Sequence, residues 1–370
     1  MDSVVIVGAG TFGASLAWWL AREGVRVTLV DQFEPGDRRA TSGGETRLIR
    51  CGHGEDPGYT ASARRARTLW RELEVESGAD VLIECGLVWF ARRRDGWEAA
   101  CEGTMRAQDI PVERLSVEEG ARLYPSFRGD DLEFLLYEPE AGVLRAQRAI
   151  QALAAQAAAH GARIVRGVAR PEGDAVALDG ERLESDAVVW ACGGWLSELF
   201  PDHVTLTTTR QDLFFLDGGP AWARAPGWVD YDGAVYGTGD LDDLGVKCAP
   251  DFEGPPLAPG DRLPVTDPAN ERWIRDYCAL RFPALVGAPL KGSTTCRYEL
   301  SPDSHFVAAP LPEHPGVWLL GGGSGHGFKH GPAMAERMAD ALRGGEPMSA
   351  RFGLGERAVG QSMRTSGSGR

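Results

Sequence analysis

Three glycines and one carboxylate near the start of the chain have the spacing of a phosphate-binding turn. Gly8, Gly10 and Gly13 follow a short apolar run, and Asp31 ends the next alternating stretch. Gly8 permits a tight turn, Gly10 lets the backbone approach a pyrophosphate, and Gly13 allows close helix–strand packing. The helix N-terminus offers free N–H groups to phosphates, and Asp31 is placed to accept from a ribose hydroxyl. The segment predicts a dinucleotide-binding βαβ unit and leaves the choice between NAD and FAD open.

A second glycine cluster, GGGSGHGFKHG, occupies residues 321–331. It follows an apolar run at 317–320 and precedes a helical pattern from about 332 to 342. Such a backbone can approach a flat ligand closely with its N–H groups, and a helix N-terminus favours negative charge there. A reduced flavin carries such charge on the N1/C2=O side of its ring. The cluster, which includes Lys329, therefore favours a cofactor loop over a plain flexible turn.

The elements that must position these residues suggest two domains. Parallel βαβ pieces are expected at the start, middle and end of the chain, with antiparallel strands between them. We therefore predict an α/β fold: a discontinuous Rossmann-type FAD-binding domain with an antiparallel-sheet substrate domain. The expected boundaries are 1–82, 145–205 and 300–350 for the FAD-binding domain, 83–144 and 206–299 for the substrate domain, and 351–370 for a disordered tail.

Composition narrows the class of protein. The 370 residues are 43% hydrophobic and 25% charged, and the net charge of −14 argues against nucleic acid or an anionic membrane as partner. No apolar run is long enough to span a bilayer, and no signal peptide is expected. The seven cysteines are odd in number and include no C-x-x-C pair. This pattern disfavours a disulfide framework and a zinc site, and a reducing cytoplasm fits it. No metal site is predicted.

Five segments together resemble a known family. They are GAGTFG with Asp31, SGGETRLIR (42–50), WACGGW (190–195), TTCRYELSPDSHF (294–306) and GGSGHGFKHG (322–331). In this order they are similar to the FAD-dependent amine oxidases of the D-amino acid oxidase-like superfamily, which include monomeric sarcosine oxidase, N-methyltryptophan oxidase and the amadoriases. The resemblance covers nearly the full length. It implies FAD as cofactor, bound by the following residues: Gly8, Gly10, Thr11, Phe12, Gly13, Asp31, Gln32, Ser42, Thr46, Arg47, Val168, Cys192, Gly193, Trp195, Cys296, Gly323, Gly325, His326, Gly327, Phe328 and Lys329.

The resemblance also implies catalytic roles. Cys296 matches the cysteine that the family joins to its flavin through a thioether, a reaction open to a thiolate beside an electrophilic ring. Lys247 matches a lysine that promotes reaction with O₂, because a fixed positive charge stabilises developing superoxide. Arg47 matches an arginine that tunes the flavin site. A buried apolar cysteine and a solvated edge-strand lysine are the ordinary alternatives.

Substrate contacts are implied in the same way. Arg50 and Lys329 match the two cations that bind an amino-acid carboxylate, and Tyr236 and Tyr298 match tyrosines that line the pocket, although core packing would also explain a tyrosine. The sequence departs from the sarcosine oxidases at Gly43 and Asp251, which stand where those enzymes have histidines. Asp251 would place a carboxylate near the substrate amine, or serve only as a turn residue after a proline. A family member of nikkomycin biosynthesis that oxidises a cyclic imino acid has a similar CGPDFE run.

These features predict a flavin-dependent oxidase of the C–N bond of an N-methyl or cyclic amino acid, giving an imine and hydrogen peroxide. A small amino acid and O₂ are the expected partners, and a monomer is expected. A natural-product tailoring oxidase acting on a cyclic imino acid or an aromatic amino acid remains the main alternative. A flavin-dependent hydroxylase and a non-catalytic nucleotide-binding protein also remain open.

Overall fold

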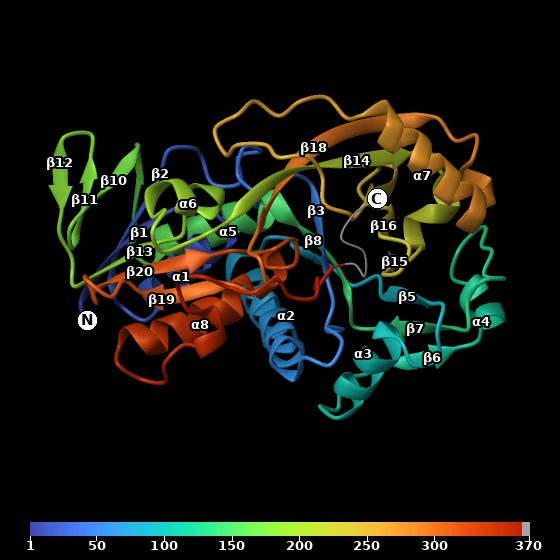
Figure 1. Ribbon diagram of the computed structural model, residues 1–370, viewed down its shortest axis with the longest axis horizontal. Coiled ribbons are helices and arrows are strands. Elements are labelled where there is room, and N and C mark those ends of the chain that lie inside the picture. Colours follow the sequence, from blue (N-terminus) through green and yellow to red (C-terminus); the bar gives the residue numbers. More distant parts are fainter. Residues whose placement is uncertain (365–370) are drawn as a thin grey trace.

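A six-stranded sheet carries the phosphate-binding turn in the computed structural model, which describes residues 1–364 (Figure 1). The strand order is β19-β20-β13-β1-β2-β9, and every pair is parallel except the edge pair β19–β20. The bounds are β1 Ser3–Val7, β2 Arg26–Asp31, β9 Arg163–Arg166, β13 Ala187–Trp190, β19 Val307–Pro310 and β20 Val317–Gly321. The central strands are apolar because helices and small elements cover both faces of the sheet.

Four helices pack beside this sheet. They are α1 Thr11–Arg22, α2 Pro57–Ser77, α5 Ala146–Ala159 and α8 Gly331–Leu342. Helix α1 is buried from Thr11 to Ala21 because it lies between the sheet and the helices α5 and α8. Helix α2 is capped at its N-terminus by Asp56, whose carboxylate accepts from the Tyr59 N–H at 2.9 Å, and at its C-terminus by Gly78, whose φ is +70°.

The second large sheet has eight strands in the order β18-β14-β17-β16-β15-β5-β7-β6. Neighbouring strands are antiparallel except β15 and β5, which are parallel. This parallel pair joins the strands of residues 87–138 to those of residues 207–300. An aromatic core that includes Phe90, Trp222, Trp228 and Phe282 holds helix α7 (Pro268–Arg281) against it. The remaining bounds are β5 Leu87–Ala91, β6 Glu113–Leu115, β7 Phe134–Glu138, β14 Thr207–Leu216, β15 Gly227–Asp230, β16 Val235–Asp240, β17 Val246–Pro250, β18 Leu290–Leu300, α3 Trp97–Arg106 and α4 Val117–Ala121.

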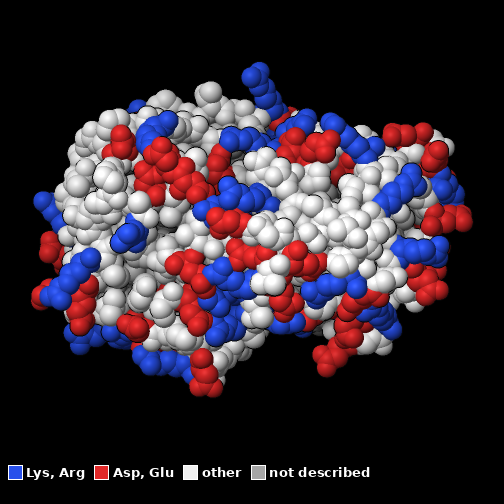
Figure 2. Space-filling model, turned by 180° about the vertical axis from the view of Figure 1, so that it is seen from behind, with Lys and Arg blue, Asp and Glu red and all other residues white. Residues whose placement is uncertain are grey.

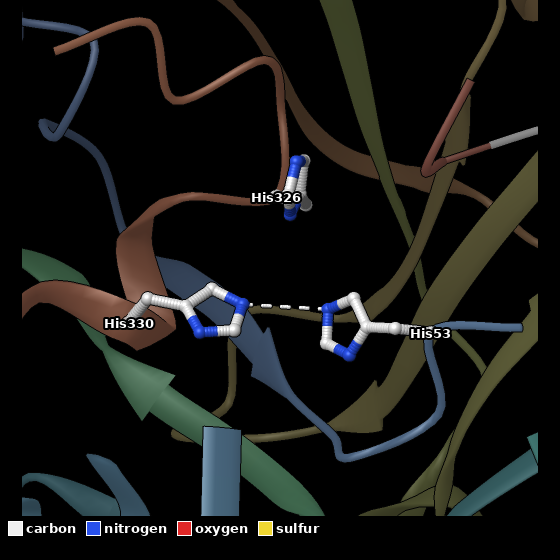
Figure 3. A group of neighbouring side chains, drawn as sticks. All are labelled: His53, His326 and His330. Atoms are coloured by element: carbon white, nitrogen blue, oxygen red, sulfur yellow. Dashed lines mark hydrogen bonds between the residues drawn. The ribbon is translucent and has the colours of Figure 1, made fainter. Parts of the chain in front are cut away.

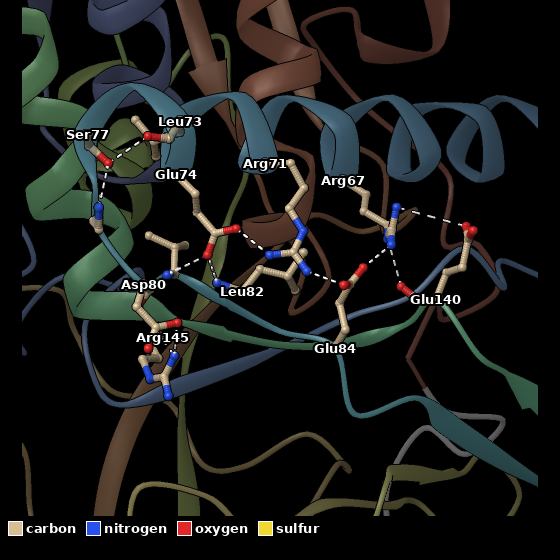
Figure 4. Close-up of polar contacts among 12 residues, drawn as sticks. Arg67, Arg71, Leu73, Glu74, Ser77, Asp80, Leu82, Glu84, Glu140 and Arg145 are labelled. Atoms are coloured by element: carbon tan, nitrogen blue, oxygen red, sulfur yellow. Dashed lines mark hydrogen bonds and ion pairs between the residues drawn. The ribbon is translucent and has the colours of Figure 1, made fainter.

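A small sheet, β3-β8-β4, carries the chain between the two large sheets. Its strands are β3 Thr46–Ile49, β4 Leu82–Ile83 and β8 Gly142–Arg145. Figure 4 shows how α2 holds it: Glu74 accepts from the N–H groups of Val81 and Leu82 at 2.8 and 2.7 Å, and Arg67 and Arg71 pair with Glu84. The network holds β4, which pairs with β8, and β8 in turn pairs with β3. Arg47 lies on β3, and Arg50 follows that strand.

The other elements are short. They are β10 Ala169–Glu172, β11 Ala175–Leu178, β12 Glu181–Leu183, α6 Leu196–Leu199, and the 3-10 turns η1 Gly193–Trp195, η2 Pro220–Arg224, η3 Pro283–Leu285, η4 Phe328–His330 and η5 Ala350–Phe352. The strands β10, β11 and β12 form a sheet of their own, and the turns η1 and η4 each carry residues expected to bind the cofactor.

The predicted fold class is confirmed: a parallel Rossmann-type sheet is combined with a largely antiparallel second sheet. The strands of the second sheet fall within residues 87–138 and 207–300, and on this pattern we propose the domain division given above. Of the tail expected to be disordered over 351–370, the structure describes residues up to 364. Residues 351–364 follow a defined path, because Phe352 is buried in the main core and Arg364 is buried beside Asp251, whereas residues 365–370 lie outside the described part of the chain.

The surface carries both signs of charge. On the face shown in Figure 2, basic and acidic side chains are interspersed over much of the area. Among the residues that the structure describes, no helix combines the length and the apolar character needed to cross a membrane.

Candidate active site

A long cavity opens at the carboxyl ends of the parallel strands. Its lining includes most of the residues predicted to bind FAD: Gly8, Gly10, Thr11, Phe12, Asp31, Gln32, Ser42, Arg47, Val168, Cys192, Gly193, Trp195, Gly323, Gly325, Gly327 and Phe328. A Cβ at Gly8 would overlap the carbonyl oxygen of Ala191, and one at Gly13 would overlap that of Gly8. These two glycines therefore set the close approach of α1 to the sheet, and Gly13 acts through packing without lining the cavity.

Asp31 lies at the end of β2 with its carboxylate fixed by the backbone. Its two oxygens accept from the N–H groups of Ala9 and Phe33 at 2.7 and 2.8 Å. Burial raises the pKa of Asp31, and these backbone hydrogen bonds oppose the rise. The carboxylate thus lines the cavity with both oxygens held by the backbone, as the prediction of a ribose contact requires.

The two glycine-rich segments meet although they stand at opposite ends of the sequence. The Thr11 hydroxyl donates to the Phe328 carbonyl at 2.9 Å, and the Thr11 N–H donates to Ser42 Oγ at 2.9 Å. The Trp70 indole donates to the Lys329 carbonyl at 2.9 Å, and its ring lies parallel to that of Phe328. The first helix, the loop at residues 40–44 and the loop at 322–331 therefore form one wall.

A smaller pocket continues from the long cavity. Both spaces are lined by Arg47, Tyr298, Gly325 and Phe328, so a ligand filling the first would have one end beside the second. The remaining lining of the smaller pocket is Leu48, Arg50, Val229, Tyr236, Asp251, His326, Lys329 and Arg364. All four residues predicted to bind substrate thus line the same small pocket.

Arg50 and Lys329 are two buried cations in this pocket. The Arg50 guanidinium donates to the carbonyls of Gly52 and Met363, the latter at 3.2 Å, and lies 4.7 Å from the Trp89 ring centre. The Lys329 ammonium donates to the His326 carbonyl at 2.8 Å. Burial lowers the pKa of both groups, and for Lys329 the charge of Arg50 adds to the effect. Both cations bind backbone carbonyls and form no ion pair with a described carboxylate, so together they favour an incoming anion.

Lys247 and Cys296 lie near Arg47, which lines both spaces, but neither residue belongs to the lining of either space. The Lys247 ammonium is buried, lies 3.3 Å from both the carbonyl and the hydroxyl oxygen of Thr46, and is 5.0 Å from the Tyr236 ring centre. Burial, assisted by the charge of Arg47, lowers the pKa of Lys247 to about 8. Cys296 precedes Tyr298 by two residues on β18, so their side chains share a face of the strand. Burial raises the pKa of the Cys296 thiol, while the charges of Arg47 and Lys247 lower it.

Asp251 is buried at the end of β17. Its carboxylate accepts from the Tyr298 hydroxyl at 3.4 Å, and that hydroxyl lies 3.4 Å from the hydroxyl of Tyr236. Burial raises the pKa of Asp251, and the charges of Arg364 and Arg50 oppose the rise. Asp251 is therefore part of the pocket and not merely a turn residue.

The structure adds residues that the sequence reasoning missed. Arg364 donates to the Asp251 carbonyl and carboxylate at 2.9 and 3.3 Å and lies over the Tyr298 ring. Glu299 is buried in the long cavity, where it accepts from the Gly323 N–H at 3.0 Å. Glu299 directly follows Tyr298 in the segment TTCRYELSPDSHF, so this motif could have identified it as a residue of the cavity. The departure at Gly43 also has a cause, because a Cβ there would overlap the Asp37 carbonyl oxygen.

The C-terminal segment, residues 358–364, occupies polar groups of the smaller pocket: the Met363 carbonyl accepts from Arg50, and Arg364 pairs with Asp251. Removing it after Arg357 frees one hydrogen-bond donor of Arg50 but also removes Arg364 and leaves the buried Asp251 carboxylate unpaired, so we expect a simple carboxylate such as acetate to bind about fivefold more weakly, a net effect of about 1 kcal/mol. Calorimetric titration with acetate measures this affinity. A chain ending after Arg364 is the control and should bind as the full chain does; equal affinity in both shortened chains would contradict the role of the segment.

Comparison with known proteins identifies the family of this chain. The model of the DAO family, described as FAD dependent oxidoreductase, matches residues 3–341. A monomeric sarcosine oxidase of Streptomyces avermitilis is 30% identical over 362 residues, covering 92% of this chain and 94% of its own. Two solved structures share the fold: NikD, an unusual amino acid oxidase essential for nikkomycin biosynthesis, with a TM-score of 0.80 and 21% identity, and iminodiacetate oxidase from Chelativorans sp. BNC1, with 0.81 and 20%. Each alignment covers 95% of this chain and 98% of the other. The chain therefore belongs to the DAO family of FAD-dependent oxidoreductases.

Proposed function

We propose that this protein oxidises the C–N bond of an N-methyl or cyclic amino acid to an imine and passes the electrons to O₂, giving hydrogen peroxide. The observation that carries the proposal is the pair of buried cations, Arg50 and Lys329, in a pocket continuous with the dinucleotide cavity. A carboxylate bound there would form charge-assisted hydrogen bonds inside the protein, where such bonds are strong.

The chain's residues fit FAD. The glycine cradle and Asp31 suit the ADP half, and Arg47, Tyr298, Gly325 and Phe328 mark where the ring end would meet the substrate pocket. When bound, the flavin supplies the acceptor for a hydride equivalent from the carbon next to nitrogen and the route for its electrons to O₂. We also propose that Cys296 joins the flavin through a thioether. Gly13 and Thr46 would support the site indirectly, Gly13 through the packing of α1 and Thr46 through its contact with Lys247.

The protein's own part is positioning and electrostatics. Arg50 and Lys329 hold the carboxylate and thereby fix the reacting C–H bond, and Tyr236 and Tyr298 limit the space beside it. Asp251 lines the same pocket beside Tyr298, where its carboxylate would contact the substrate amine. Lys247 places a positive charge beside the site where O₂ is reduced.

The relatives support a secondary amine as substrate, because their names specify sarcosine, N-methyl-L-tryptophan and iminodiacetate. Asp251 supports a second candidate function, a tailoring oxidase that acts on a cyclic imino acid. A buried carboxylate in the pocket would favour a cationic ring nitrogen. We further propose that the protein is a monomer of a reducing compartment such as the cytoplasm. All seven cysteines are free, which supports this compartment.

Anaerobic bleaching of the bound flavin tests the function. We expect N-methyl and cyclic amino acids to bleach it, whereas the matching amines without a carboxylate do so at least about 30-fold less efficiently, the effect of losing about 2 kcal/mol of ion pairing. Replacing Arg50 by Met should remove most of the difference between the two sets. Preference for primary D-amino acids, or equal rates with and without the carboxylate, would contradict the proposal.

A further inference from the structure

Three buried histidines converge beside the substrate pocket (Figure 3). His53 follows β3, whereas His326 and His330 lie at the two ends of the turn that leads into α8. One nitrogen of each ring lies within 4.8 Å of the others, and His53 Nε2 and His330 Nε2 are 3.3 Å apart. Figure 3 shows the rings of His53 and His330 pointing toward each other, with His326 next to them.

The other nitrogen of each ring is held by an oxygen. His53 Nδ1 lies 3.0 Å from the Cys51 carbonyl, His326 Nε2 lies 2.9 Å from the Ser304 carbonyl, and His330 Nδ1 lies 3.0 Å from Ser62 Oγ. This is the arrangement by which proteins orient metal-binding histidines: the outer N–H donates to an oxygen and the inner nitrogen faces the ion.

The protonation states can be assigned from these contacts. A carbonyl only accepts, so His53 Nδ1 and His326 Nε2 carry hydrogen. Burial and the charge of Lys329 lower the pKa of all three imidazoles, which favours their neutral forms. The inner nitrogens of His53 and His326 therefore present lone pairs, and the buried His326 Nδ1 has no hydrogen-bond partner among the described residues.

We propose that His53, His326 and His330 form a binding site for a divalent first-row transition metal, with Zn²⁺ as the simplest occupant. Two nitrogens bound to zinc at about 2.0–2.1 Å with tetrahedral geometry stand roughly 3.3 Å apart. His53 and His330 already have this separation. His330 contributes its lone pair when its Nδ1–H donates to Ser62 Oγ, and His326 needs a small inward movement.

The neighbouring charges limit the affinity and suggest a structural role. Lys329 and Arg50 lie close enough to lower the pKa of the histidines, so they also oppose a dication. The metal would connect the segment after Arg50 to the loop that carries Lys329. It would thereby fix the spacing of the two cations of the pocket without touching the substrate.

Metal binding by the flavin-loaded, tag-free protein tests the site. We expect one Zn²⁺ per chain after equilibrium dialysis, and Co²⁺ should give the intense d–d bands of a tetrahedral site at longer wavelength than the flavin. His53→Gln and His330→Gln should each weaken binding at least about tenfold, since even loss of a supporting partner costs 10–100-fold. His314→Gln, on a turn away from the cluster, is the matched control and should bind as the natural chain does.

The natural chain alone can overturn the proposal. Absence of stoichiometric Zn²⁺, or an X-ray absorption spectrum of the Zn²⁺ form without imidazole scattering, would show that the three rings only bind one another. If His53→Gln or His330→Gln kept its flavin spectrum and melting temperature and bound Zn²⁺ as tightly as the natural chain, the metal would lie elsewhere.

Discussion

Replacing Cys296 by Ala is expected to make all of the bound FAD extractable by acid, whereas the natural chain should keep its yellow colour in the precipitate. The thiol is buried and shares a face of β18 with Tyr298, which lines both cavities. The charges of Arg47 and Lys247 favour the thiolate, the form that can add to an electrophilic flavin. Absorbance of the supernatant and the mass of the intact protein measure the outcome.

Cys192→Ala is the matched control because Cys192 itself lines the dinucleotide cavity, whereas Cys296 is buried behind the lining residue Tyr298 on the same strand face. Burial raises the pKa of its thiol, and the nearby charges of Asp31 and Glu299 raise it further, so it is poorly suited to attack. This variant should retain covalent flavin. Covalent flavin in Cys296→Ala, or extractable flavin in the natural chain, would contradict the assignment of Cys296.

Replacing Lys247 by Met is expected to slow the reaction of the reduced enzyme with O₂ roughly 10²–10³-fold, the usual cost of losing one preorganised charge-stabilising group. Met has a similar length and no charge, so packing against Tyr236 is largely kept. Anaerobic reduction by substrate should change little, because Arg50 and Lys329 hold the carboxylate. Stopped-flow measurement of the two half-reactions separates these effects.

The same residue predicts a pH dependence. Burial lowers the pKa of Lys247 to about 8, so the ammonium is charged below that pH and neutral above it. If the charge promotes reduction of O₂, the rate constant of this step is constant at low pH and falls as the pH rises through about 8. Lys247→Met should lose this dependence. Lys291 lies on the same sheet and pairs with the exposed Asp243, so Lys291→Met is the control and should keep the pH dependence. The same pH profile in both variants would exclude Lys247 as the source of the dependence.

Local patterns determined the nucleotide-binding unit. The apolar run, the glycines and Asp31 predict a strand, a turn, a helix and a second strand, because each depends on neighbours within a few residues. The alternation of such units with antiparallel segments was enough to predict the fold class. The roles of Cys296 and Lys247 came from the family motifs and remain predictions. The residue types and charges of the sequence alone would not have suggested either role.

Only the tertiary structure decided which distant side chains meet. Arg50 and Lys329 come from opposite ends of the chain, and no periodicity in the sequence fixes their common pocket. The same is true of the contacts from Arg364 to Asp251 and of the three histidines, which had led to no metal prediction. Such contacts depend on the packing of α1, α8 and the two sheets, which brings sequence-distant segments together once their apolar faces are buried.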